Sequence, residues 1–297
     1  MKKRVAIYYE NRLGRNDGFP LYAWNLLRDK ELYPDIDVVH LIPNGDYGPF
    51  GKFDLHLWID WGEDGLTNIL PYKIVLPQGK LAYFASDTHL GYDYRLSMAK
   101  KADFVFCAQK EGAEKMIKDG VKAEWLPHGV EPRAFPSEPK AMKKYDVSFV
   151  GHIVSKERLA FLDKIFKKFP NFWFGSRLSR YVKVEEGVSD DCADIYKKTR
   201  IVLNPPTKGD VNMRCFEATA TGSMLLTEDV YGLSDLFEYD KEIVTYKNVD
   251  EAIDKIKYYL ENEDEREIIA QEGMRRTLKD HTYKQRLDIM LKKAGII

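Results

Sequence analysis

Short apolar runs alternate with amphipathic stretches along most of this chain. The apolar runs place valine, isoleucine, leucine and aromatic residues on consecutive positions, as in strands that are covered on both faces. In the first half they predict strands at residues 4–10, 37–43, 53–60, 73–77, 81–86, 103–108 and 124–127. In the second half they predict strands at residues 146–150, 171–174, 200–204, 223–227 and 242–246.

Apolar residues spaced by three and four positions predict helices between these strands. The predicted helices lie at residues 21–29, 95–101, 111–119, 156–169, 192–199, around Glu217, and at 249–261, 263–278 and 283–293. Strands that alternate with helices imply parallel sheets of the doubly wound α/β kind.

A proline-rich segment interrupts this alternation. Residues 127–139 contain four prolines among charged residues, which is typical of a linker. We therefore expect two Rossmann-like domains, residues 1–132 and residues 140–280. Ligands of such sheets bind at the carboxyl ends of the strands, near helix N-termini, so these positions hold the candidate site residues.

The segment 212–227 carries the most specific chemical pattern. It predicts a short helix that ends near Gly222 and leads into a buried strand. Glu217 lies in this helix among small residues, which predicts a buried carboxylate. Because a carboxylate accepts two hydrogen bonds from a vicinal diol, we expect Glu217 to bind sugar hydroxyls, which points to an enzyme that uses a nucleotide sugar. Arg214 is predicted to face the diphosphate and Asn212 to bind the donor, and the alternative is a plain Arg214–Glu217 ion pair.

A second anion-binding candidate follows the predicted strand at 146–150. The strand ends at Gly151, and Ser155 is a suitable N-cap for the next helix. Lys156 and Arg158 lie in the first turn of that helix, where the helix dipole disfavours basic residues unless an anion is bound. A solvated first turn is the alternative, and it suits Lys156 better than Arg158.

Two loops of the first half also follow strands. Gly14 lies in the first of them, which matches neither a dinucleotide-binding nor a Walker pattern, so its position is its only link to the site. Asp87 and His89 lie in the second, where they could supply a general base or bind substrate hydroxyls. The alternative is that Asp87 caps the next turn and His89 is a surface residue.

Composition narrows the choice of partner and compartment. Lysine and arginine number 46 against 47 aspartates and glutamates, a net charge of -1, which argues against nucleic acid or a membrane surface as a partner. A local basic groove would still allow DNA as an acceptor.

Three cysteines without metal-ligand spacing suit a reducing cytoplasm, and no stretch is long enough for a membrane span. We expect a cytoplasmic protein with no metal and no cofactor.

Five motifs together resemble those of CgeB-like, spore-maturation type glycosyltransferases, a GT-B branch related to glycosyltransferase family four. They are N-x-R-x-x-E-A-x-A-x-G-x-x-L-L-T-E-D at 212–229, Y-D-V-S-F-V-G at 145–151, E-R-x-x-x-A-x-x-G at 265–273, H-T-Y-x-x-R at 281–286 and W-L-P-H-G-V at 125–130. The resemblance extends from about residue 80 to the end of the chain.

The resemblance implies a GT-B fold, with the donor held by the second domain and the acceptor mainly by the first. It implies that residues 281–297 cross back to the first domain, that Glu217 holds the donor ribose and that basic residues near 151–158 face the diphosphate. Family four often carries a second glutamate eight positions before the first. Gly209 stands there in this chain, beside Lys208, which we assign to donor binding.

The sequence thus predicts a metal-independent glycosyltransferase that moves a sugar from a nucleoside-diphosphate sugar to a hydroxyl of a carbohydrate or another acceptor. The resemblance adds retention of configuration. Two alternatives stay open. Gly209 in place of a glutamate fits a non-catalytic nucleotide-sugar-binding or scaffold module. A GT-B fold also fits a phage-type enzyme that glycosylates DNA bases.

Overall fold

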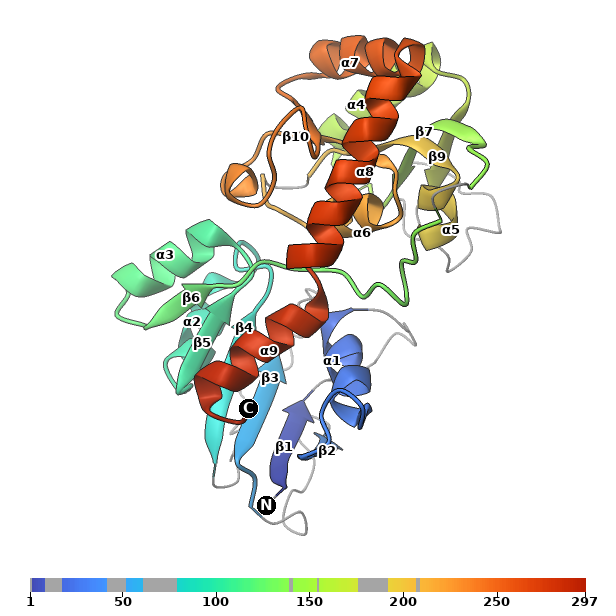
Figure 1. Cartoon of the computed structure of the whole chain (residues 1–297). Coiled ribbons are helices and arrows are strands. Elements are labelled where there is room, and N and C mark those ends of the chain that lie inside the picture. Colours follow the sequence, from blue (N-terminus) through green and yellow to red (C-terminus); the bar gives the residue numbers. More distant parts are fainter. Residues whose placement is uncertain are drawn as a thin grey trace. The chain divides into compact units, whose positions relative to one another are not determined.

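Two units make up the chain in the computed structural model, which describes residues 2–8, 18–41, 52–60, 79–138, 141–153, 155–175, 192–206 and 209–297. Unit 1 comprises Met1–His128 and Tyr283–Ile297, and unit 2 comprises Gly129–Thr282 (Figure 1). Among the described helices, none combines the length and the apolar composition needed to cross a membrane.

Unit 1 is built on a parallel sheet with the strand order β2-β1-β3-β4-β5-β6. Its strands are β1 (Lys3–Tyr8), β2 (Ile36–Leu41), β3 (Leu55–Ile59), β4 (Lys80–Ala85), β5 (Phe104–Cys107) and β6 (Ala123–Trp125). Its helices are α1 (Phe19–Arg28), α2 (Tyr92–Ala99), α3 (Lys110–Lys118) and α9 (Tyr283–Ala294).

The helices of unit 1 cover both faces of its sheet. Helices α1 and α9 share one apolar core with the sheet, and α2 and α3 share another. The ring of Tyr283 in α9 stacks on Phe19 in α1, with 4.6 Å between the ring centroids. The final helix therefore packs on the first sheet although the chain passes through unit 2 before it, which confirms the expected GT-B connectivity (Figure 1).

Unit 2 is built on a second parallel sheet, with the order β11-β10-β9-β7-β8. Its strands are β7 (Tyr145–Val150), β8 (Phe172–Gly175), β9 (Thr199–Asn204), β10 (Met224–Glu228) and β11 (Val244–Tyr246). Its helices are α4 (Lys156–Lys168), α5 (Cys192–Lys197), α6 (Arg214–Ala220), the 3-10 turn η2 (Leu233–Asp235), α7 (Val249–Glu261) and α8 (Glu263–Asp280). Residues of α4, α7 and α8 form one core with alternate residues of the sheet.

Each sheet has one point where the strand order reverses. It lies between β1 and β3 in unit 1 and between β7 and β9 in unit 2. Loops from neighbouring strands diverge there to opposite faces of the sheet, so the carboxyl edge is left open to a ligand. The candidate residues of unit 2 are grouped around this point.

The predicted elements agree with this architecture. Every predicted strand within the described residues overlaps an observed one, and residues 73–77 lie outside them. Helix α2 begins at Tyr92, three residues before the predicted start, because Gly91 in the left-handed conformation marks its N-cap. The fold class, α/β with two doubly wound sheets, is confirmed.

Candidate functional site

The carboxyl ends of β7 and β9 carry the densest group of candidate residues in unit 2. Gly151 directly follows β7, and the buried Asn204 ends β9. Helix α6 and the first turn of α4 both begin near this edge. The fold therefore brings Gly151, Arg158 and Arg214 to the same end of one sheet.

Arg214 is fixed by neutral oxygen atoms. Its Nε donates to the Val150 carbonyl at 3.0 Å, and its Nη1 donates to Asn204 Oδ1 at 2.5 Å. Its Cζ lies 4.7 Å from the ring centroid of Phe149, as in a cation–π contact. Within the part of the chain that is described, no carboxylate forms a salt bridge with Arg214. Its positive charge is thus held rigidly at this edge.

Arg158 lies next to it and is also held by backbone carbonyls. Its Nη1 donates to His152 at 2.8 Å, its Nη2 donates to Pro205 at 2.5 Å, and the residue is only 9% exposed. Burial lowers the pKa of Arg158 to about 10, and the neighbouring charge of Arg214 adds to that effect. Two cations at the same edge raise the electrostatic potential there, which favours an anion.

The two basic residues predicted in the first turn of α4 have different surroundings. Ser155 is the N-cap, and its hydroxyl accepts from the Arg158 backbone N–H at 3.1 Å. Lys156 is exposed, in keeping with the solvated first turn that was the alternative for this residue. Of the two, Arg158 is the one that turns back toward the strand ends.

Asn204 organises the loop that leads into α6, and sequence reasoning missed it. Its Nδ2 donates to Thr227 Oγ1 at 3.0 Å, and its Oδ1 accepts from Asn212 Nδ2 at 3.2 Å as well as from Arg214. The Asn204 carbonyl accepts from Tyr246 at 3.2 Å. The only signal that could have revealed it was an asparagine directly after the buried apolar residues 201–203.

Glu217 differs from the expectation in one respect. It lies in α6 as predicted, but it is half-buried and not fully enclosed, whereas its neighbours Phe216 and Ala218 in the same helix are buried. Arg214 bonds to Val150 and Asn204 and not to Glu217, so the plain ion pair on the helix surface is absent between these two described residues.

Gly209 precedes this helix and is exposed. Its φ is +67°, and no described atom lies within 4 Å of the position that a Cβ would occupy there. Gly14 and Lys208, two other predicted donor-binding residues, lie outside the described residues.

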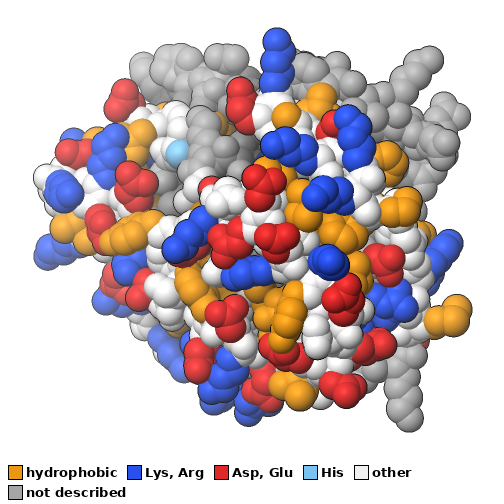
Figure 2. Space-filling view, turned by 90° about the horizontal axis from the view of Figure 1, so that it is seen from above, with side chains coloured by type: hydrophobic (Ala, Val, Ile, Leu, Met, Phe, Trp, Pro, Cys, Tyr) orange, Lys and Arg blue, Asp and Glu red, His pale blue; other side chains and the backbone are white. Residues whose placement is uncertain are grey.

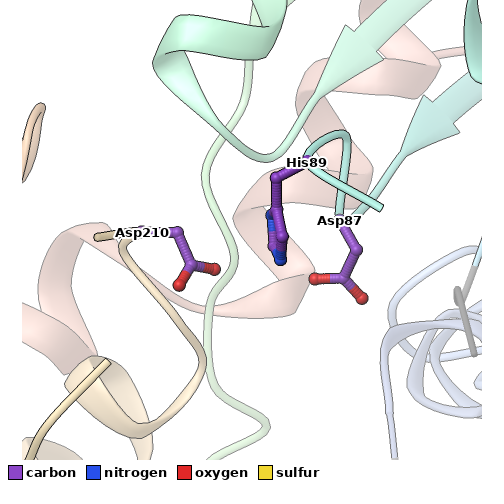
Figure 3. A group of neighbouring side chains, drawn as sticks. All are labelled: Asp87, His89 and Asp210. Carbon is purple, nitrogen blue, oxygen red and sulfur yellow. The ribbon is translucent and has the colours of Figure 1, made fainter. Parts of the chain in front are cut away.

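Asp87 and His89 lie in the loop between β4 and α2 of unit 1. Both residues are half-buried. Figure 3 shows their side chains projecting from this loop. Asp87 has a φ of +47°, a left-handed conformation that costs a non-glycine residue about 1 kcal/mol, which the surrounding structure must offset. Asp210, also labelled in Figure 3, belongs to the loop before α6 in unit 2.

Charged side chains on the surface are mixed. In the view of Figure 2, lysine and arginine side chains are interspersed with aspartate and glutamate. The described part of this face carries no broad field of one sign, which agrees with the net charge of -1.

Comparisons with known proteins bear on this geometry. Residues 151–292 match the family described as glycosyl transferase-like, a segment that begins at the end of β7 and includes the whole Arg214–Glu217 region. No protein of curated function matches the chain.

Solved structures match over nearly the whole chain. HepE of Anabaena, solved in complex with UDP and glucose, is 11% identical. The match covers 99% of this chain and 100% of HepE, with a TM-score of 0.65. The sucrose-phosphate synthase of Thermosynechococcus elongatus is 11% identical, and the match covers 99% of this chain and 98% of the synthase, with a TM-score of 0.66. TarM of S. aureus is 14% identical, with 81% of this chain and 55% of TarM covered and a TM-score of 0.59.

The family match over residues 151–292 supports a glycosyltransferase enzyme, and the solved structures show that the chain has the GT-B fold. The glycosyltransferase prediction made from the residues at 212–229 is confirmed at this level. The roles of individual site residues stay predictions.

Proposed function

We propose that this GT-B enzyme transfers a sugar from a nucleoside-diphosphate sugar to an acceptor hydroxyl, with retention of configuration and without a metal ion. We further propose that it is of the CgeB-like type and acts in the cytoplasm. The observation that carries the proposal is the pair of fixed cations, Arg158 and Arg214, at the point where the strand order of unit 2 reverses.

These cations suit the leaving group of such a reaction. Negative charge develops on the diphosphate as its bond to the sugar breaks, and a preorganised positive group there can lower the barrier by roughly 3 kcal/mol. Arginine keeps its charge at all relevant pH values and presents planar donors that match phosphate oxygens. A cationic site of this kind supplies the neutralisation that a metal ion provides in other transferases.

The half-buried Glu217 is proposed to hold the donor ribose. It lies one turn after Arg214 in α6, so a donor whose diphosphate contacts Arg214 would have its ribose near Glu217. HepE was solved with UDP-glucose, and TarM with UDP, so uridine diphosphate sugars are the first donors to test. Asn212 and Gly151 would shape the same subsite, because Asn212 bonds Asn204 and Gly151 leaves room for Arg214.

Asp87 and His89 are proposed to act on the acceptor or the donor sugar. The loop after β4 ends at the carboxyl edge of the first sheet, where an acceptor hydroxyl could meet a carboxylate or an imidazole. Exclusion of water during transfer would limit hydrolysis of the donor.

The test is release of nucleoside diphosphate from UDP-, GDP- and TDP-sugars with a panel of hydroxyl acceptors, with and without EDTA. We expect turnover with at least one donor, insensitivity to EDTA and an anomer of unchanged configuration by NMR. Arg214→Ala should lower kcat/KM about 100-fold, since a charge-assisted contact contributes about 1.5–3 kcal/mol.

Arg200→Ala is the matched control. Arg200 lies in β9 of the same sheet but pairs with Asp146 at the amino ends of the strands, at 3.1 Å. Its replacement should leave turnover within about twofold, the small effect expected of a surface ion pair. Binding of UDP without turnover of any donor would instead favour the non-catalytic module, and salt-dependent DNA binding would favour the DNA-modifying alternative.

A further inference from the structure

Beneath the loop that carries Asp87 and His89 lies a buried ion pair. Arg95 of α2 and Asp60, which directly follows β3, approach to 2.9 Å between Nε and Oδ2, and their side chains are 2% and 7% exposed. Tyr83 of β4 donates its hydroxyl to the same Asp60 Oδ2 at 3.1 Å. Asp60 is thereby held by two donors from two different elements.

The same guanidinium also holds both ends of the loop at residues 86–91. Its Nε donates to the Ser86 carbonyl, and its Nη1 donates to the carbonyls of Leu90 and, at 3.5 Å, Gly91. The Ser86 hydroxyl donates to the Asp60 carbonyl. One buried cation therefore clamps the chain immediately before Asp87 and immediately after His89.

A second anchor holds the middle of this loop. Gln109, the N-cap of α3, accepts from the backbone N–H of Thr88 at 3.1 Å and from its hydroxyl at 3.2 Å. Gly112 in the first turn of α3 leaves space for Thr88, because a Cβ there would overlap its Oγ1. The loop is closed by a hydrogen bond of 2.7 Å from the Leu90 N–H to the Asp87 carbonyl.

We infer that Arg95, through its ion pair with Asp60, is a positioning residue that fixes the Asp87 and His89 side chains for the transfer reaction; this rests on the proposed function. Two observations favour positioning over mere stability. A buried ion pair adds little stability relative to apolar side chains of the same size. A strained non-glycine residue such as Asp87, at a φ of +47°, persists only where its neighbours over-determine it.

The chemical reason is preorganisation. A carboxylate or an imidazole accelerates proton transfer only when it is held within hydrogen-bonding distance of the reacting hydroxyl. A guanidinium carries five N–H donors in one rigid plane, so Arg95 can contact the Asp60 carboxylate and the Ser86 and Leu90 carbonyls at the same time. A lysine in its place would offer one flexible ammonium and could not hold both ends of the loop.

The decisive variant is the double replacement Arg95→Met with Asp60→Asn. It removes both charges at once, so neither is left buried and unpaired, and the new amide oxygen at position 60 would still accept from Tyr83. We expect amide hydrogen exchange in residues 86–91 to rise about tenfold or more while β4 and β5 stay protected. We expect kcat to fall about tenfold or more, with the donor Kd measured by calorimetry unchanged within about twofold.

Two further variants keep the test decisive. Arg95→Lys retains the positive charge, so it can be measured even if the double variant fails to fold. It should loosen the loop and lower kcat to an intermediate extent. Arg266→Met is the control for loss of a buried arginine, because Arg266 is 1% exposed and its hydrogen bonds within the described chain go to residues of α7 and α8. It should lower the Tm but not kcat.

Unchanged exchange of residues 86–91 in the double variant would overturn the inference. A loosened loop with an unchanged kcat would also overturn it, since the loop would then not need to be held. Absence of turnover by the wild-type protein with every donor would reject the proposed function and with it the catalytic part of the inference. The exchange comparison would still decide whether the ion pair holds the loop.

Discussion

The α-carbon of Gly151 lies against the guanidinium of Arg214, so closely that a Cβ on residue 151 would overlap Nη2. Phe149 supports the same guanidinium from its ring face. A side chain at residue 151 would push Arg214 out of the position in which it bonds the Val150 carbonyl. Glycine is therefore needed here for close approach.

Gly151→Ala should weaken binding of UDP about tenfold or more. The displaced cation would lose a charge-assisted contact with the diphosphate, and such contacts contribute about 1.5–3 kcal/mol. Calorimetry with UDP measures the loss directly. Gly120→Ala is the control for a strained glycine replacement without a close neighbour: its φ is +86° and no described atom lies within 4 Å of its Cβ position, so stability should fall but UDP affinity should not. Equal UDP affinity in the Gly151 variant and the wild type would show that Arg214 does not bind the diphosphate.

Glu217→Ala should weaken UDP binding without unfolding the protein. The half-buried carboxylate is proposed to accept two hydrogen bonds from the ribose, and their loss would reduce affinity about tenfold to 100-fold. Glu261→Ala, an exposed glutamate at the end of α7, provides a control for loss of one negative charge. The ribose assignment predicts in addition that 2′,3′-dideoxy-UDP binds the Glu217 variant and the wild type almost equally.

The elements were predictable from the sequence because their signals are local. Apolar runs such as β9 and β10 are continuous in the chain, and the long amphipathic helices α7 and α8 carry three- and four-residue spacing. The link between the last helix and the first sheet came from resemblance, since no local pattern records which of two sheets a helix covers.

The site was predictable only in part. Residues in the first turn of a helix that follows a strand, such as Arg158 and Arg214, are marked by their position in the chain, because the carboxyl edge of a parallel sheet gathers them. The partners that hold these and other buried side chains were missed because the contacting residues are far apart in the sequence. Arg214 bonds Val150, and Arg95 pairs with Asp60. A single sequence contains no spacing rule for such pairs.

Asp87→Asn and His89→Ala should each lower kcat more than they raise the donor KM. Both side chains lie in unit 1, whereas the proposed diphosphate and ribose contacts lie in unit 2. Loss of a general acid or base lowers the rate about 100-fold. Asp93→Asn, an exposed residue in the first turn of α2, is the control in the same unit. Wild-type rates in both site variants would remove Asp87 and His89 from the reaction.

His128 predicts a specific dependence of stability on pH. It is the last residue of unit 1 before the chain enters unit 2, it is 5% exposed, and Arg286 donates to its carbonyl at 3.1 Å from Nη2. Burial, and then the charge of Arg286, lowers the pKa of the His128 imidazole from 6.5 to about 4. The folded protein therefore keeps this imidazole neutral at pH values where the unfolded chain binds a proton.

The sign of the effect follows from proton linkage. Above pH 6.5 the imidazole is neutral in both states and contributes no pH dependence. As the pH falls from 6.5 to about 4, only the unfolded state gains the proton, so the free energy of unfolding decreases by up to about 3 kcal/mol. His128→Gln removes this titration, and all other groups are shared. Urea unfolding at about pH 7 and about pH 4.5 should show a smaller loss of stability for the variant, and parallel losses would mean that the His128 imidazole is protonated in the folded protein.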